Sequence, residues 1–448
     1  RWDGEWEEWI RQRYGSVEAA ERDWGAAVPR EDGKVAGPAD ADVTAESRIP
    51  RIAAAYRRFQ DDFLSRKHME ARQKIRTLDQ RHLLSFRMSI AGDPTCGPTI
   101  MPYDFTGLAR SMDFMSPEGY GRIGDRERVR PGWFTAAYSR MVAPGRPVIW
   151  AEFGYTLWNR GERPETDPTL DFADALDRRH YLPATIAFTE RYYREFYEMA
   201  LDSQADGTVC WWYPGGFRFG ENSDYGIINP DGTWRGITRI IAEYARKFKS
   251  PMEPRVPDAW ITVDRDRHPD GIYGMYNEIK GEFWRLADAG KFPGLRTEGD
   301  DLDSATAPLT AVGGVPYTGT NPVRHLNAEF ERVEVLDAAG DWTQVPYEGG
   351  KVRVAPDAPI RIRVVAGNNG TAKWLAQSGT GQVLVAAYRD GAVAAASPIE
   401  TDVERYGTTG VLNLTIPFAS SGSEVVITMQ AAGRCTFGER RRITVAAE

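Results

Sequence analysis

The chain has 448 residues, of which 42% are hydrophobic and 27% charged, and its formal net charge is −8. This composition is typical of a globular protein with two or three domains. The acidic balance, without a basic tail or cluster, argues against a nucleic-acid partner, and no apolar run approaches the roughly 20 residues that span a membrane.

The first 64 residues carry two helical patterns separated by a loop. Apolar residues at helical spacing cover 2–24, with a break at Gly15 and a new N-cap at Ser16. A stretch rich in Ala, Asp, Gly and Pro follows over 26–47 and predicts a surface loop. A long helix then begins near Ile49, with Pro50 in its first turn, where proline is tolerated.

Strands and helices alternate over the next part of the chain. Strand patterns lie at 82–89, 114–116, 147–152 and 207–212, and helical patterns at about 131–143, 184–203 and 235–248. This alternation predicts right-handed βαβ units and a parallel sheet. Four units correspond to half of an eightfold (β/α)₈ TIM barrel, so strands five to eight are expected in this chain.

The composition changes after residue 250. Three prolines between 251 and 257 mark a linker, and 301–328 looks extended. Beyond 330 about seven short strands alternate with turns, which is typical of an Ig-like β-sandwich. The sequence therefore predicts half of a TIM-barrel catalytic domain over 1–250, a linker with a short helix over 251–329, and an accessory β-sandwich over 330–448.

The stretch Pro147–Gly154 is the strongest candidate for a catalytic strand. Four apolar residues lead to Glu152, and Phe153 and Gly154 follow at once. Such a run predicts a strand buried on both faces, where an unpaired carboxylate would cost several kcal/mol. At the carboxyl end of the strand, however, Glu152 reaches the edge where α/β proteins build their active sites. Alternatively, Glu152 caps the next helix or pairs with an arginine.

Polar and aromatic residues also end the other predicted strands. These residues are Arg87, Glu118, Tyr120, Trp211 and Trp212. A retaining glycosidase needs a nucleophilic carboxylate and a second carboxyl group about 5 Å away, and tryptophan can form a platform for a sugar ring.

Two further residues, Arg218 and Asn222, lie in the following polar loop and could hold a sugar hydroxyl. Every one of these candidates also has a purely structural interpretation. Glu118 could be a solvated carboxylate, Tyr120 could be a core residue, and Arg87 could form a structural ion pair. Strand alternation would bury one of the two tryptophans.

The motif PVIWAEFG at 147–154 resembles the seventh-strand nucleophile motif of the clan A retaining glycoside hydrolases, which are (β/α)₈ barrels. The resemblance implies that Glu152 is the nucleophile, that Tyr120 in SPEGYG orients it, and that Trp211 or Trp212 stacks on the sugar. GENSDYGIINPDG at 220–232 is similar to the loop after the eighth strand. WEEWIRQRYGSVEAAERDWG at 6–25 is similar to the helical segment after the fourth strand.

The chain departs from this family at the acid/base. In clan A that residue is a glutamate after an asparagine at the end of the fourth strand, and no such pair fills the role over 1–250. The acid/base is therefore expected in a segment before Arg1 or in a second chain, and a processed or truncated product is expected because the chain begins without Met.

The function expected from these observations is retaining hydrolysis of a β-linked glycoside, with a carbohydrate as substrate and no cofactor. The alternatives are a non-catalytic carbohydrate-binding or scaffold protein on a degenerate barrel, and a different barrel hydrolase that uses Glu118 with Glu152. The three cysteines match no metal spacing, and Asp264, Asp266 and Asp270 predict a solvated turn rather than a calcium site. Secretion, or a bacterial periplasmic location, is expected for an enzyme acting on external glycosides.

Overall fold

The computed structural model of the protein describes residues 2–86, 94–95, 105–119, 129–157, 183–216, 218, 223–250, 252–307, 325–347, 349–355, 358–417 and 422–447. The chain divides into two compact units. Unit 1 comprises Arg1–Met69, Asp264–Pro269 and Thr297–Glu448, and unit 2 comprises Glu70–Val263 and Asp270–Arg296. This division differs from the expected boundaries at 250 and 330, because the N-terminal helices cluster with the C-terminal strands.

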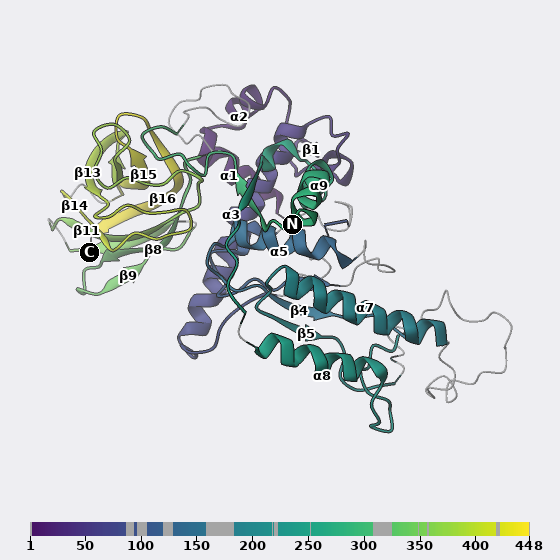
Figure 1. Cartoon of the computed structure of the whole chain (residues 1–448). Coiled ribbons are helices and arrows are strands. Elements are labelled where there is room, and N and C mark those ends of the chain that lie inside the picture. Colours follow the sequence, from purple (N-terminus) through teal and green to yellow (C-terminus); the bar gives the residue numbers. More distant parts are fainter. Residues whose placement is uncertain are drawn as a thin grey trace. The chain divides into compact units, whose positions relative to one another are not determined.

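Unit 2 is an α/β unit with a parallel three-stranded sheet in the order β3-β4-β5 (Figure 1). The strands are β3 (Glu118–Gly119), β4 (Ile149–Phe153) and β5 (Gly207–Cys210). The helices that follow them in turn are α5 (Pro131–Val142), α7 (Pro183–Asp202) and α8 (Gly236–Lys249). The unit also contains β6 (Ala259–Val263), α9 (Ile272–Asp288) and β7 (Pro293–Thr297), in which β6 pairs with β7. The predicted alternation of strands and helices is confirmed over this range.

The strand expected at 82–89 is not formed by the described residues 82–86. Leu84 accepts a hydrogen bond from the Asp113 N–H at 2.8 Å, so this segment runs beside the start of the next strand. Leu83 is nevertheless 65% exposed, and the prediction of a buried strand is wrong here. The physical reason is that, in the part of the chain that the structure describes, no strand pairs with this segment. The remainder of 82–89 lies outside the described residues.

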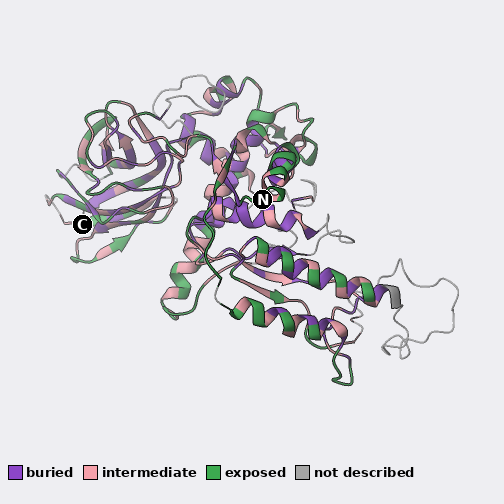
Figure 2. Cartoon of the chain, in the orientation of Figure 1, coloured by how far each residue is buried: buried purple, intermediate pink, exposed green. Residues whose placement is uncertain are grey.

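The helices cover one face of the sheet. Phe153 of β4 stacks on Phe196 of α7 with ring centroids 4.0 Å apart and an interplanar angle of 2°. A side chain at Gly119 would lie 2.4 Å from the Phe196 ring, so the glycine makes room for this contact. Figure 2 shows α7 and α8 with buried residues on one side and exposed residues on the other, as amphipathic helices on a sheet require.

Unit 1 begins with helices that pack through aromatic side chains. They are α1 (Asp3–Tyr14), α2 (Val17–Trp24) and α3 (Pro50–Arg76), whose last turns belong to unit 2. Trp6 is fully buried, and its ring stacks with those of Trp9 and Trp24, at centroid distances of 5.3 and 5.7 Å. The Ser16 side chain accepts the Ala19 N–H and caps α2, as predicted. These N-terminal tryptophans are therefore core residues. A short hairpin, β1 (Arg30–Glu31) and β2 (Lys34–Val35), follows α2.

The rest of unit 1 is all β, and we call strands β8 to β16 the β-domain. Its strands are β8 (Ala328–Leu336), β9 (Trp342–Gln344), β10 (Gly350–Val354), β11 (Ile360–Asn368), β12 (Val383–Arg389), β13 (Ala392–Pro398), β14 (Leu412–Ile416), β15 (Glu424–Ala431) and β16 (Cys435–Ala447). They form a five-stranded sheet, β10-β16-β15-β12-β13, and a four-stranded sheet, β14-β11-β8-β9, which share one hydrophobic core. None of the described helices is long and apolar enough to cross a membrane.

Candidate functional site

The two candidate carboxylates lie in register on neighbouring strands. Glu118 of β3 pairs with Glu152 of β4, and Gly119 pairs with Phe153. Neighbouring strands lie about 4.8 Å apart, and residues in register on parallel strands share one face of the sheet. The structure therefore places the two side chains next to each other, at the carboxyl ends of their strands.

Glu152 and Glu118 point away from the helical layer. Phe153 and Gly119 face α7, and successive side chains of a strand point to opposite faces. The register of β4 against β5 shifts between Trp150 and Phe153, and both of these aromatic residues pack on Phe196. A β-bulge of this kind re-aims side chains, and bulges are common beside active sites.

The burial of the two carboxylates differs. Glu118 is 1% exposed, whereas Glu152 is half-buried. The prediction that β4 is buried on both faces is met only in part: Trp150 and Phe153 are buried, but Ile149 and Ala151 are half-buried like Glu152. Within β4, Glu152 is therefore more exposed than the two aromatic residues that pack on α7.

Two tryptophans follow β5 at the same end of the sheet. The Trp211 N–H donates to the Phe153 carbonyl at 2.8 Å, and the Trp211 and Trp212 rings lie 4.7 Å apart, joined by a cis peptide bond. The Arg218 guanidinium lies 5.1 and 4.8 Å from the two ring centroids, within the range of cation–π attraction. Both tryptophans are half-buried, so the alternative in which one of them is a core residue is wrong.

The loop that carries these tryptophans is anchored by a buried ion pair. Arg235 donates to both oxygens of Asp224, at 3.0 and 2.7 Å, and the side chains are 6% and 0% exposed. Asp224 also accepts the backbone N–H groups of Gly226 and Gly216. Asp224 thus holds the loop together, and its buried carboxylate accepts hydrogen bonds from Arg235 and from two backbone N–H groups.

Gly154 is a second structural requirement of the site. A side chain at this position would meet the Trp211 carbonyl oxygen at 2.3 Å, so only glycine allows the two segments to approach this closely. Both residues of the Phe153-Gly154 pair in the sequence motif therefore have packing roles: Phe153 packs on α7, and Gly154 packs against the backbone of Trp211.

Three of the sequence candidates, Arg87, Tyr120 and Asn222, lie outside the described residues, and their roles stay predictions. Cys210 ends β5 close to the site, but burial raises the pKa of its thiol. A raised pKa disfavours the thiolate, so Cys210 is poorly suited to act as a nucleophile.

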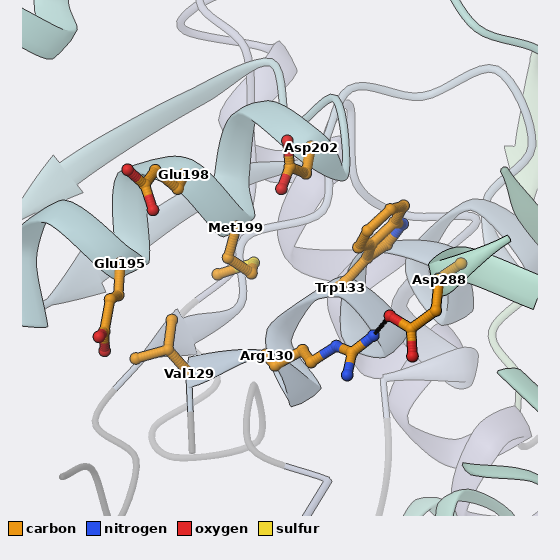
Figure 3. A pocket seen from close by; sticks show the side chains of 9 residues that line it. Val129, Arg130, Trp133, Glu195, Glu198, Met199, Asp202 and Asp288 are labelled. Atoms are coloured by element: carbon orange, nitrogen blue, oxygen red, sulfur yellow. Dashed lines mark hydrogen bonds and ion pairs between the residues drawn. The ribbon is translucent and has the colours of Figure 1, made fainter. Parts of the chain in front are cut away.

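A separate cavity of about 350 Å³ lies among α5, α7 and α9 and contains none of the sequence candidates (Figure 3). Its carboxylates from Glu195, Glu198 and Asp202 are spread along α7 and do not converge, while Arg130 forms an ion pair with Asp288. Within the described ranges no cluster of His, Cys, Asp and Glu could hold a metal ion.

The acidic turn at 264–270 has a structural role. Asp266 forms an ion pair with Arg58 at 2.7 Å, and the Asp264 side chain accepts the Asp266 N–H.

No family model and no curated protein matches the chain. Among solved structures it is similar to GH5_18 from Streptomyces cattleya in complex with GlcNAc (17% identity, 44% of this chain and 47% of that chain, TM-score 0.31). It is also similar to GH5_18 from Bifidobacterium longum (16% identity, 43% and 45%, TM-score 0.32). A third match is a β-galactosidase from Halorubrum lacusprofundi (13% identity, 97% and 76%, TM-score 0.45). The chain spans less than half the length of the two GH5_18 structures, so the assignment of function rests on the geometry of the site.

Proposed function

We propose that this protein is a retaining glycoside hydrolase that cleaves a β-linked glycoside, with Glu152 as its nucleophile. The observation that carries the proposal is the register of Glu152 with Glu118 on adjacent parallel strands. With strands about 4.8 Å apart, the two carboxyl groups come near the separation of about 5–5.5 Å that retaining hydrolysis uses. In this proposal unit 2 is the second half of a (β/α)₈ barrel, and the β-domain is an accessory sandwich.

The chemistry takes two steps. In the first step a Glu152 oxygen attacks the anomeric carbon, the bond to the leaving oxygen breaks, and Glu118 donates a proton to that oxygen. In the second step Glu118 takes a proton from water, whose oxygen attacks the anomeric carbon and releases Glu152. Trp211 and Trp212 provide the aromatic surface for the sugar ring, and Arg218 fixes their orientation.

A glutamate outside this chain is the alternative to Glu118 as the acid/base. The resemblance to clan A implies an Asn-Glu pair outside this chain, in which case Glu118 positions or binds and does not transfer the proton. The two assignments differ in what Glu118→Gln does to substrates with good and poor leaving groups. An acid/base variant loses about 10²- to 10⁴-fold with a poor leaving group but keeps activity with a good one, whose departure needs no proton.

The test uses a panel of aryl β-glycosides on the full protein. Glu152→Gln is expected to abolish hydrolysis while sugar binding survives, and normal turnover by this variant would refute the assignment. Glu118→Gln should hydrolyse dinitrophenyl glycosides far better than alkyl glycosides, and azide should accelerate it with retention of configuration. If Glu118→Gln loses the same factor of activity on dinitrophenyl and on alkyl glycosides, then another residue is the acid/base. Glu243→Gln is the matched control, because Glu243 is exposed on α8.

A second candidate function is carbohydrate binding without hydrolysis. The observation that favours it is the burial of Glu118, which is 1% exposed and so is poorly placed to reach a leaving oxygen. This candidate predicts that the wild-type protein binds oligosaccharides but turns over no member of the panel, and that Glu152→Gln binds them with unchanged affinity.

A further inference from the structure

We propose that unit 2 has a second sugar-ring site, distinct from the carboxylate pair, in a pocket where the first turns of α7 and α8 meet. This second site rests on the proposed function only for the class of its ligand, which is a neutral hexopyranose ring. The pocket has a volume of about 210 Å³ and is lined by Leu157, Ile186, Glu190, Trp234, Arg235 and Ile237, among others. Pockets for drug-sized ligands hold about 300–1,000 Å³, so this one suits a single ring.

Trp234 supplies an aromatic surface to this pocket. Its side chain is 60% exposed, and an isolated antiparallel bridge to Ile228 fixes its backbone across the turn at 229–233. A large exposed aromatic residue on a fixed turn, at the rim of a cavity, is suited to stack on the apolar face of a sugar ring. Ile186 and Ile237 add apolar side chains to the lining of the same pocket.

Glu190 supplies a hydrogen-bond acceptor. Its carboxylate is half-buried against the first residue of α8, where a side chain at Gly236 would come within 1.6 Å of it. No described residue donates a hydrogen bond to this carboxylate, and α8 has no side-chain cap. A half-buried carboxylate in that position has acceptor capacity for the hydroxyl groups of a ligand.

The charge of the pocket favours a neutral ligand. Arg235 lines the pocket, but its guanidinium is engaged by Asp224 in the buried ion pair described above. Glu190 is then the group whose charge faces the cavity, so a phosphate or carboxylate ligand would be repelled. A neutral ring with several hydroxyl donors matches both the acceptor and the aromatic surface.

The test observes Trp234 directly. In the full protein labelled with 5-fluorotryptophan, the Trp234 fluorine resonance is assigned with Trp234→Phe and followed during titration with methyl β-hexosides and with oligosaccharides of glucose, galactose, mannose and N-acetylglucosamine. At least one sugar is expected to shift this resonance saturably. Glu190→Gln is expected to raise the dissociation constant about tenfold, because a hydrogen bond to a charged group is replaced by one to a neutral amide.

The control residue is Trp260, which is 53% exposed on β6 and does not line the pocket; its resonance should stay in place. The proposal is overturned if no sugar moves the Trp234 resonance, or if Glu190→Gln binds the sugar with the affinity of the wild type. It is also overturned if butylammonium, a small organic cation, moves the resonance and sugars do not. A protein that hydrolyses aryl glycosides while Trp234 stays silent refutes this site alone. Sugar binding at Trp234 without any hydrolysis refutes the proposed activity alone.

Discussion

Removing the arginine of the buried ion pair should destabilise the end of unit 2 that holds the tryptophans. In Arg235→Leu the Asp224 carboxylate, whose side chain is fully buried, loses two hydrogen bonds of 3.0 and 2.7 Å. It keeps two backbone donors, from Gly226 and Gly216. Breaking a buried ion pair by removing one partner costs about 3–5 kcal/mol, because the remaining charge stays uncompensated.

Native-state hydrogen exchange measured by mass spectrometry can localise this loss. Peptides from 205–250 should exchange more than about 100-fold faster in Arg235→Leu than in the wild type, which corresponds to about 3 kcal/mol. Peptides of the β-domain, which belongs to unit 1, should be unchanged.

The control is Arg194→Leu in the same unit. Arg194 pairs with Glu243 at 3.1 Å, but the two side chains are 49% and 46% exposed, and such exposed pairs contribute about 0–1 kcal/mol. If Arg235→Leu and Arg194→Leu change exchange equally, then the ion pair does not anchor the loop, and the reasoning fails. A double-mutant cycle with Asp224→Asn should give a coupling energy of about 2 kcal/mol or more.

Three other predictions test separate parts of the chain. Gly154→Ala should cost about 1–3 kcal/mol, because its methyl group would meet the backbone oxygen of Trp211 at 2.3 Å; urea denaturation measures this, and wild-type stability would contradict it. Burial, together with a hydrogen bond to Glu198, raises the pKa of Tyr244 to about 12. Tyrosine in the unfolded chain ionises near pH 10. The folding stability that protonated Tyr244 contributes is therefore fully present below that pH and is lost as the pH rises toward 12. Between pH 9.5 and 11.5 the melting temperature should therefore fall less steeply in Tyr244→Phe than in the wild type. Ser16→Ala removes the cap of α2 and should cost about 1 kcal/mol in urea, whereas Ser16→Asp should restore most of it.

Local signals predicted the helices well. Ser16 marks the start of α2 at Val17, and Pro50 is the first residue of α3. Both signals act within one helical turn, through an orphan N–H group or through a fixed φ angle. Such features can be found in a sequence because the partner groups are only a few residues apart.

The division into units depends on partners that are far apart in the chain. Ser65 of α3 donates to Glu329 of β8 at 2.8 Å, and Asn327 donates to Asp62 at 3.3 Å. Each pair is separated by more than 260 residues, so nothing near Ser65 indicates that its helix packs with the β-domain. The expected boundary near 250 followed the composition of the chain, which does not encode these contacts.

Strand β16 does not have the apolar alternation of a buried strand. Its middle contains a run of charged residues, which argues against a buried strand, yet Glu439 and Arg441 are 4% and 5% exposed and form an ion pair. A buried pair of opposite charges can stand where an apolar alternation is expected. The sequence pattern cannot show this, because the residues that bury the pair lie elsewhere in the chain.

The candidate site likewise has one feature that the sequence shows locally and one that depends on distant partners. Glu152 stands out in the sequence because a single charge ends an apolar run, and this contrast is local. Its partnership with Glu118 is not local, because it depends on which residue of β3 lies opposite which residue of β4. A shift of one residue in that register would place Glu118 opposite Phe153, on the face packed against α7, where Phe196 leaves no room for a side chain. The packing of Gly119 on Phe196 therefore fixes the register, and the same contact that builds the core sets the two carboxylates side by side.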